Sequence, residues 1–374
     1  MDLIGEAILH GFADRLPAEF AAEQICPPYH HRFARLPVVG RRGAATNADR
    51  LLNRSWDYPR TLSKIARRGD FDLYHIVDHS YSQLVHVLPP GRAVVTCHDL
   101  DTFRCLLEPD REPRPRWFRV MTRRILDGLR KASAVACDSE ATRDALVRHG
   151  IQPADRAHVV HLGIHPDFSY HPDPSADADA DALLGPSRPD DPPDLLHVGS
   201  NIPRKRVDVL LDVFANVRRS VPGTRLLKIG GALPPELQRR AVDLGVADAI
   251  VTLPFLDRAV VAAVYRRASL VLQTSDAEGF GLPVAEALAC GAPLLATDLP
   301  VLREVGGDAP IYRPVGDVPA WTKAALSLLE QRRTSLKTYQ TRRAAGIDRA
   351  RAFSWTTHGA RLAEIHREVL SRAN

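Results

Sequence analysis

The chain has 374 residues, of which 45% are hydrophobic and 25% charged, and these proportions are ordinary for a folded globular protein. They exclude intrinsic disorder as the general state of the chain, and the length suits two α/β domains better than a single core. The formal net charge of +5 permits attraction to anionic lipids or nucleotides but requires neither.

Cysteine usage and hydropathy indicate the compartment. The five cysteines are scattered, with neither a paired motif nor the spacing of a zinc site, so we expect reduced thiols. No apolar run is long enough to span a bilayer, and the first residues lack the basic-then-apolar layout of a signal peptide. These features predict a cytoplasmic protein.

The N-terminal part of the chain, residues 1–165, predicts a Rossmann-like domain. Residues 1–16 have helical apolar spacing with no strand before them, although such a domain normally begins with a buried strand. We therefore expect the first strand to be missing or to lie upstream. Short apolar runs predict strands at 73–77, 93–97, 133–137 and 159–160. A basic amphipathic helix is expected over 117–131, and Ser139 is expected to cap the next helix.

The composition changes abruptly at residues 166–194, which are rich in Pro, Asp and Ala. We interpret this stretch as an interdomain linker with solvated aspartates at 177, 179 and 181. Strands and helices then alternate over 195–352, which predicts a second Rossmann-like domain with a parallel, doubly wound sheet. Its strands are expected at 195–198, 226–229, 250–253, 270–273 and 293–296. Residues 353–374 predict a final amphipathic helix.

The most informative segment is SDAEGFGLPVAE at residues 275–286, which directly follows a predicted strand. Glu278 is expected in the loop and Glu286 one turn into a helix that runs to about residue 290. Gly279 and Gly281 allow the backbone to approach a ligand, and the N–H groups of the loop and first turn form an anion site suited to a diphosphate. The alternative is a simple turn with two solvated glutamates.

A second segment, LLHVGSNIPRKR at residues 195–206, again combines a strand, a loop and the start of a helix. Arg204 and Lys205 stand at the helix start, which is unfavourable for cations unless an anion binds nearby. Arginine can hold a phosphate with two hydrogen bonds, and lysine can neutralise charge on a departing diphosphate. A solvated basic turn is the alternative.

Together these segments resemble glycosyltransferase family 4, the retaining enzymes of GT-B fold. EGFGLPVAE presents the pattern of two glutamates separated by seven residues, and VGSNIPRKR is similar to the donor-phosphate loop of that family. The resemblance implies two Rossmann-like domains that face each other across a cleft. It implies that Glu286 holds a ribose. The donor-binding residues that it implies are Gly199, Ser200, Arg204, Lys205, Glu278, Gly279, Phe280, Gly281, Leu282 and Glu286.

The resemblance extends to His98, which follows the predicted strand 93–97. In the family a histidine at this strand end faces the cleft and the donor sugar, so His98 joins Glu278, Arg204 and Lys205 as a predicted catalytic residue. A histidine bonded to a loop carbonyl is the alternative. The tail that begins at FSW resembles the family's final helix, which crosses back onto the N-terminal domain.

Two features depart from the family pattern. The glycine-rich loop that many members carry after the first strand is not found in this sequence. Arg206 stands where glycine or asparagine often follows the lysine.

The function implied by the resemblance is transfer of a hexose from a UDP-, GDP- or ADP-sugar to a saccharide or lipid-linked acceptor, with retention of configuration and no metal or other cofactor. One alternative is a metal-dependent transferase that uses Asp99 and Asp101, which follow a strand. Another is a catalytically impaired binding protein with the same fold. We do not expect nucleic-acid binding. The basic helix near Arg116 to Arg124 predicts either contact with a membrane surface or a solvated face.

Overall fold

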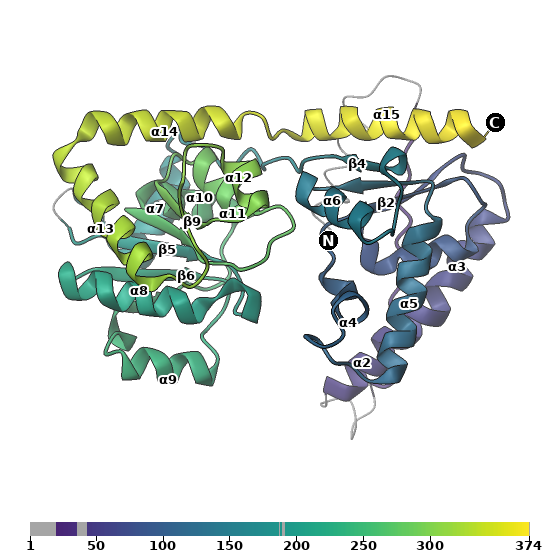
Figure 1. Ribbon diagram of the computed structural model, residues 1–374, viewed down its shortest axis with the longest axis horizontal. Coiled ribbons are helices and arrows are strands. Elements are labelled where there is room, and N and C mark those ends of the chain that lie inside the picture. Colours follow the sequence, from purple (N-terminus) through teal and green to yellow (C-terminus); the bar gives the residue numbers. More distant parts are fainter. Residues whose placement is uncertain (1–19, 36–42, 187, 189–190, 374) are drawn as a thin grey trace. The chain divides into compact units, whose positions relative to one another are not determined.

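The computed structural model describes residues 20–35, 43–186, 188 and 191–373 (Figure 1). The chain divides into two compact units. Unit 1 combines residues up to His161 with those from Trp355 onward, and unit 2 spans Leu162–Ser354. The helix predicted for residues 1–16 lies outside the described residues. No helix within the described ranges combines the length and the apolar character that crossing a bilayer requires.

Unit 1 is built on a parallel sheet whose spatial order, β1-β2-β3-β4, follows the chain. Its strands lie where short apolar runs predicted them: β1 (Tyr74–Ile76), β2 (Ala93–Cys97), β3 (Ala134–Cys137) and β4 (Ala157–Val159). Its longer helical elements are α2 (Gly43–Leu52), a π-helical turn (Asn53–Asp57), α3 (Tyr58–Ala66), a 3-10 helix (His79–Val87), α4 (Arg104–Leu107), α5 (Arg116–Lys131), α6 (Glu140–Arg148) and α15 (Trp355–Ala373). Ser139 accepts from the N–H of Thr142 and so caps α6 as expected.

The two faces of this sheet are covered by different parts of the chain. Side chains alternate between faces along a strand, so Val95 and Val135 point to one face while Val94 and Ala134 point to the other. The first face packs against α5 and the 3-10 helix, with Leu129 fully buried between them. The second face packs against α15 through apolar side chains including Leu362. The helix predicted at the end of the chain therefore completes the core of unit 1 (Figure 1).

Unit 2 contains a six-stranded parallel sheet in the order β10-β9-β8-β5-β6-β7. The strands are β5 (Asp194–Val198), β6 (Arg225–Ile229), β7 (Ile250–Thr252), β8 (Leu270–Gln273), β9 (Leu294–Thr297) and β10 (Ile311–Arg313). The longer helices are α7 (Pro174–Leu184), α8 (Val207–Ser220), α9 (Pro235–Asp243), α10 (Arg258–Arg267), α11 (Leu282–Ala289), α12 (Pro300–Gly306), α13 (Val318–Thr334) and α14 (Leu336–Ala350). Sequence analysis missed β10, a three-residue strand at the edge of the sheet.

The strand order reverses direction at the β5–β8 pair, because the chain adds β6 and β7 on one side and β8 to β10 on the other. The loops that follow β5 and β8 therefore leave the sheet at neighbouring points. In doubly wound sheets such a switch point, at the carboxyl ends of the strands, is where ligands bind.

The predicted linker at 166–194 needs a correction. Within it, Pro174–Leu184 form α7, whose first turn is capped by the side chain of Asp173. Two of the solvent-accessible aspartates also form ion pairs with α10, Asp177 with Arg266 and Asp181 with Arg267. Ala176, Ala180 and Leu184 recur at helical spacing and are buried. The proline and aspartate that suggested a linker are helix-start signals here.

Candidate functional site

Two predicted loops meet at the switch point of unit 2. Residues Pro203–Lys205 form a 3-10 turn after β5, and Arg206 then adopts φ = 47°, in the left-handed region, before α8 begins. The loop after β8 is bound to this turn by two hydrogen bonds. The Thr274 hydroxyl donates to the Lys205 carbonyl over 2.9 Å, and the Asp276 N–H donates to the Arg204 carbonyl over 2.8 Å. The two informative sequence segments are therefore one site.

Arg204, Lys205 and Glu278 form a charged cluster at this junction. The Lys205 ammonium lies 2.6 Å from one carboxylate oxygen of Glu278, and the Arg204 guanidinium lies 3.1 Å from the other. The side chains of Lys205 and Glu278 are only 10% and 5% exposed. Two cations against one carboxylate leave the cluster with a net charge of +1. It is therefore a partly buried site that favours an anion.

Gln273 was missed by sequence analysis although it belongs to this cluster. Its side-chain amide donates to Glu278 over 2.7 Å and to the Ser275 hydroxyl over 3.0 Å. The available signal was a polar residue at the end of an otherwise apolar strand. With Gln273 and both cations bound to it, the Glu278 carboxylate is held in one position. Its predicted contact with a sugar stays a prediction.

The backbone of residues 279–282 forms the start of α11 beside the cluster. Gly281 adopts φ = 95°, and a Cβ at this position would lie 2.6 Å from the Leu302 side chain, so glycine is required. Leu282 is the first helical residue and is exposed, and Pro283, which suits the first turn of a helix, is the second. The Phe280 ring packs against Phe353 at 5.4 Å, so only the backbone of Phe280 is available to a ligand.

Glu286 lies one turn into α11, as predicted, in surroundings unlike those of Glu278. The Tyr265 hydroxyl on α10 donates to its carboxylate over 3.0 Å. Burial raises the pKa of Glu286 to about 7, although the hydrogen bond from Tyr265 acts in the opposite direction. The two glutamates are therefore chemically different: Glu278 is ion-paired, whereas Glu286 is hydrogen-bonded by a neutral phenol.

His98 lies at the carboxyl end of β2 in unit 1. Its Nδ1 is 2.7 Å from an Asp138 carboxylate oxygen and its Nε2 is 3.0 Å from the Val77 carbonyl. Both partners accept hydrogen bonds, so both ring nitrogens carry protons and the ring is a cation. Burial alone lowers the pKa of His98, but the hydrogen bond and charge of Asp138, with the charge of Asp78, raise it to about 9. The carbonyl bond is the alternative that sequence analysis left open, and the contact with a donor sugar stays a prediction.

Asp99 and Asp101 were the candidates for a metal site. One Asp99 oxygen accepts from the Asp101 N–H over 3.0 Å, so this side chain closes a local turn. Over the ranges that the structure describes, His, Cys, Asp and Glu side chains do not gather in threes in a way that could hold a metal ion.

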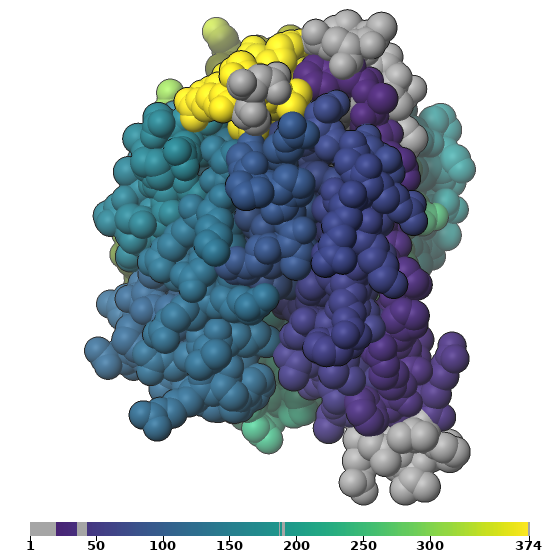
Figure 2. All heavy atoms as spheres, turned by 90° about the vertical axis from the view of Figure 1, so that its right-hand side faces the viewer, coloured from purple at the N-terminus to yellow at the C-terminus, as the bar shows by residue number. Residues whose placement is uncertain are grey.

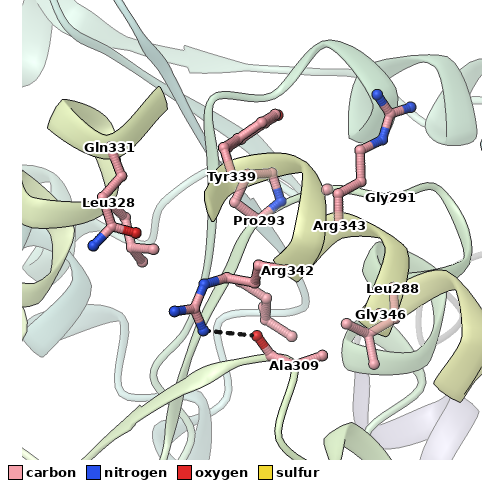
Figure 3. Close-up of a pocket in the computed structure, with 12 residues that line it drawn as sticks. Leu288, Gly291, Pro293, Ala309, Leu328, Gln331, Tyr339, Arg342, Arg343 and Gly346 are labelled. Atoms are coloured by element: carbon pink, nitrogen blue, oxygen red, sulfur yellow. Dashed lines mark hydrogen bonds between the residues drawn. The ribbon is translucent and has the colours of Figure 1, made fainter. Parts of the chain in front are cut away.

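A small apolar pocket lies elsewhere in unit 2, between α11, α13 and α14 (Figure 3). Pro293 and Leu294, which line it, mark the amino end of β9, whereas the charged cluster lies at the carboxyl ends of β5 and β8. Arg342 donates to the Ala309 carbonyl over 3.2 Å at its edge. We do not regard this pocket as the functional site, because ligands of doubly wound sheets bind at the carboxyl ends.

Comparison with protein families gives two matches that together cover most of the chain. Residues 6–168 match the model described as Glycosyltransferase Family 4. Residues 185–345 match the model described as Glycosyl transferases group 1. The boundary between the two matches falls in the segment that contains α7.

Among curated relatives, the D-inositol 3-phosphate glycosyltransferase of Mycobacteroides abscessus is 31% identical over 275 residues, which cover 71% of this chain and 58% of the relative. The O-antigen chain mannosyltransferase B of Escherichia coli is 27% identical over 294 residues, which cover 77% of this chain and 74% of the relative. This chain therefore spans little more than half the length of the first relative.

Solved structures confirm the predicted GT-B fold. The structure of WaaG, a glycosyltransferase involved in lipopolysaccharide biosynthesis, matches with a TM-score of 0.70 at 18% identity and covers 97% of this chain and 95% of its own. Anabaena HepE, solved in complex with UDP and glucose, matches with a TM-score of 0.67 at 21% identity over 84% of this chain and 82% of its own.

Proposed function

Because the chain belongs to glycosyltransferase family 4, among the group 1 glycosyltransferases, we propose that it transfers a hexose from a nucleotide diphosphate sugar to a hydroxyl of a saccharide or lipid-linked acceptor. One observation carries the proposal: Arg204 and Lys205 converge on Glu278 at the switch point of unit 2, next to the first turn of α11. A net positive cluster beside helical N–H groups suits a diphosphate.

In the proposed reaction the bond between the sugar and the diphosphate breaks while Arg204, Lys205 and the first turn of α11 stabilise the charge of the departing diphosphate. We propose that Arg204 and Lys205 neutralise the charge of the diphosphate, as a divalent metal ion does in other transferases. The proposed reaction therefore needs no metal ion. Glu278 is a poor covalent nucleophile, because both of its oxygens are bound to cations. We propose that the acceptor oxygen bonds to the sugar carbon on the face from which the diphosphate leaves, while a phosphate oxygen takes the acceptor proton. Attack on that same face retains the configuration.

Glu286 is the proposed ribose ligand. A carboxylate accepts strongly from sugar hydroxyls, and Tyr265 fixes its position. Among the relatives, HepE was solved with UDP and glucose, and the Escherichia coli relative is named a mannosyltransferase. These names favour a hexose donor and motivate a panel of several nucleotide sugars.

The test is a thermal-shift panel of UDP-, GDP- and ADP-sugars. One nucleotide series is expected to stabilise the wild-type protein by about 2.7 kcal/mol at a concentration 100 times Kd. Glu286→Ala and Lys205→Ala are expected to abolish the shift, because they remove the ribose ligand and a diphosphate cation. The shift is expected to persist in the presence of a chelator.

The control for this panel is Lys323→Ala, a loss of one exposed cation on α13 in the same unit. It should respond as the wild-type protein does. No stabilisation by any series, or equal shifts in the two site variants and the wild type, would contradict the proposed donor site.

We further propose that α5 places unit 1 on an anionic membrane surface. Trp117 and Val120 are 62% and 64% exposed, and they share an outward stripe with Arg116, Arg123 and Arg124. Within the described residues, these three arginines form no ion pair. Figure 2 looks onto unit 1, where residues of this part of the chain form the blue surface. Exposed aromatic side chains among unpaired cations suit the interface of an anionic bilayer.

Vesicle co-sedimentation tests this contact. The wild-type protein is expected to bind vesicles that contain anionic lipid, and Arg123→Glu with Arg124→Glu should weaken binding by at least about tenfold, since each basic residue contributes about 1 kcal/mol at such a surface. The matched control is Arg333→Glu with Lys337→Glu, the same charge change on exposed positions of unit 2. Equal binding by both double variants would show that α5 has no special role.

A further inference from the structure

Lys228 is a buried lysine beneath the candidate donor site. It lies in β6, within the otherwise apolar run Leu226–Ile229, and the residue is fully buried. Its ammonium donates to the carbonyl of Gly199, the first residue after β5, over 2.6 Å. Lys228 therefore joins its own strand to the loop that carries Arg204 and Lys205.

Unlike those two cations, Lys228 has no acidic partner. Within the described residues, no carboxylate forms an ion pair with it, whereas Arg204 and Lys205 both bind Glu278. Lys205 is a charged neighbour, because its charge lowers the pKa of Lys228, and a Cβ on Gly199 would lie 3.7 Å from the Lys205 side chain. Gly199 is thus adjacent to the side chains of two lysines, one of which donates to its carbonyl.

His197 completes the surroundings of Lys228 as its register partner on β5. It is fully buried, and across the described chain neither of its ring nitrogens has a hydrogen-bond partner. Burial, followed by the charges of Lys228 and Lys205, lowers the pKa of His197 to about 3. The ring is therefore neutral and does not offset the charge of Lys228.

The Gly199 carbonyl is confined on two sides. A Cβ on Gly230 would lie 2.2 Å from the Gly199 oxygen, so the backbone at Gly230 closes one side and the Lys228 ammonium the other. Asn201 adds a second tie, because its amide donates to the Ala232 carbonyl over 2.7 Å. The loop after β5 is thus joined to β6 by Lys228 and to the loop after β6 by Asn201.

An ammonium without a counter-ion is unfavourable in a protein interior. An apolar residue at this place in β6 would pack at no such cost, as Leu226 on the same face of the strand does. An anion bound by the loop above Lys228 would bring a negative charge near its ammonium.

We propose that Lys228 is a positioning residue for the donor diphosphate: it holds the Gly199 carbonyl and places an uncompensated positive charge beneath the loop of Arg204 and Lys205. This inference rests on the proposed function and deepens it. The negative charge of a bound diphosphate would offset the positive charge of Lys228. The loop, and not Lys228, would contact the diphosphate.

The test compares Lys228→Met with Lys228→Gln. Methionine removes the charge and the donor, whereas glutamine keeps an N–H donor without the charge. For each variant, calorimetry measures the unfolding midpoint and the Kd of UDP, GDP and ADP. Lys228→Met is expected to unfold at a higher temperature than the wild type and to bind its nucleoside diphosphate about tenfold more weakly. Lys228→Gln is expected to bind between the two.

A pH series adds a second readout. Burial, and then the charge of Lys205, lowers the pKa of Lys228 to about 8. As the pH rises through 8, the folded wild type loses this proton, whereas an unfolded lysine keeps it until a higher pH. The affinity of the wild type for the nucleoside diphosphate should therefore fall. Its free energy of unfolding should rise relative to that of Lys228→Met. Lys205 remains in the variant and His197 is already neutral, so the difference between the proteins isolates Lys228.

The control is Lys323→Met, which loses one exposed cation in the same unit and should match the wild type. If Lys228→Met binds as tightly as the wild type, or loses affinity and stability together, the inference fails and the proposed function stands. If the wild type binds none of the three nucleoside diphosphates, both fail.

Discussion

Lys205→Ala is expected to lower kcat/KM by about 10²- to 10³-fold, the effect of removing one electrostatic group from a charge-stabilising site. Two causes contribute. The departing diphosphate loses one of its two cations, and the largely buried Glu278 carboxylate loses the partner 2.6 Å away. Arg204 and Gln273 still hold Glu278, so the protein should remain folded. Initial rates with the donor identified by thermal shift give the measurement.

A double-mutant cycle separates the two causes. If Lys205 acts only by holding Glu278, then Lys205→Ala should cost nothing further in a Glu278→Gln background. If Lys205 contacts the diphosphate, the double variant should be slower than Glu278→Gln alone. We expect the second result. If Lys205→Ala has a kcat/KM within a factor of two of the wild type, the charged cluster does not stabilise the departing diphosphate.

Leu362→Ala is expected to lower the free energy of unfolding of unit 1 by about 2–5 kcal/mol, a large part of the stability of an ordinary domain. Leu362 on α15 is fully buried against the second face of the unit 1 sheet. Truncation leaves a cavity between helix and sheet that neither can close without moving. Denaturant unfolding followed by circular dichroism measures the loss.

Leu336→Ala is the matched control, since this leucine at the start of α14 is 59% exposed. It should change the unfolding free energy by less than about 0.5 kcal/mol. Binding of the nucleoside diphosphate below the unfolding transition should be unaffected by Leu362→Ala, because the candidate site lies in unit 2. Equal stability of the two variants would contradict the assigned role of α15.

Several features of the fold and site could be predicted from the sequence. Buried parallel strands appear as short apolar runs, so all nine predicted strands lie within a few residues of strands in the structure. The candidate site was predicted from two loops whose residues are unusual for a simple turn. Arg204 and Lys205 are cations at the start of a helix, where positive charge is unfavourable. Gly279 and Gly281, between a strand and a helix, allow the backbone to approach a ligand closely. The family and the GT-B fold, predicted from these segments, are confirmed.

Other features depend on contacts between distant residues, which a local pattern does not encode. The pairing of Arg204 and Lys205 with Glu278 requires β5 and β8 to be neighbours, and strand order is a property of the whole sheet. The bond from His98 to Asp138 joins residues 40 positions apart, and it holds the partly buried His98 ring as a cation.

The apolar stripe of α15 and the apolar strand of Lys228 show the same limit. Periodicity along the chain indicates which side of an element is buried, so the amino-acid sequence alone predicts that side. The partner on that side was decided only by the tertiary structure: the second face of the unit 1 sheet for Leu362, and the Gly199 carbonyl for the Lys228 ammonium. The physical reason is that burial is a property of one residue, whereas a contact requires two segments to arrive at the same place.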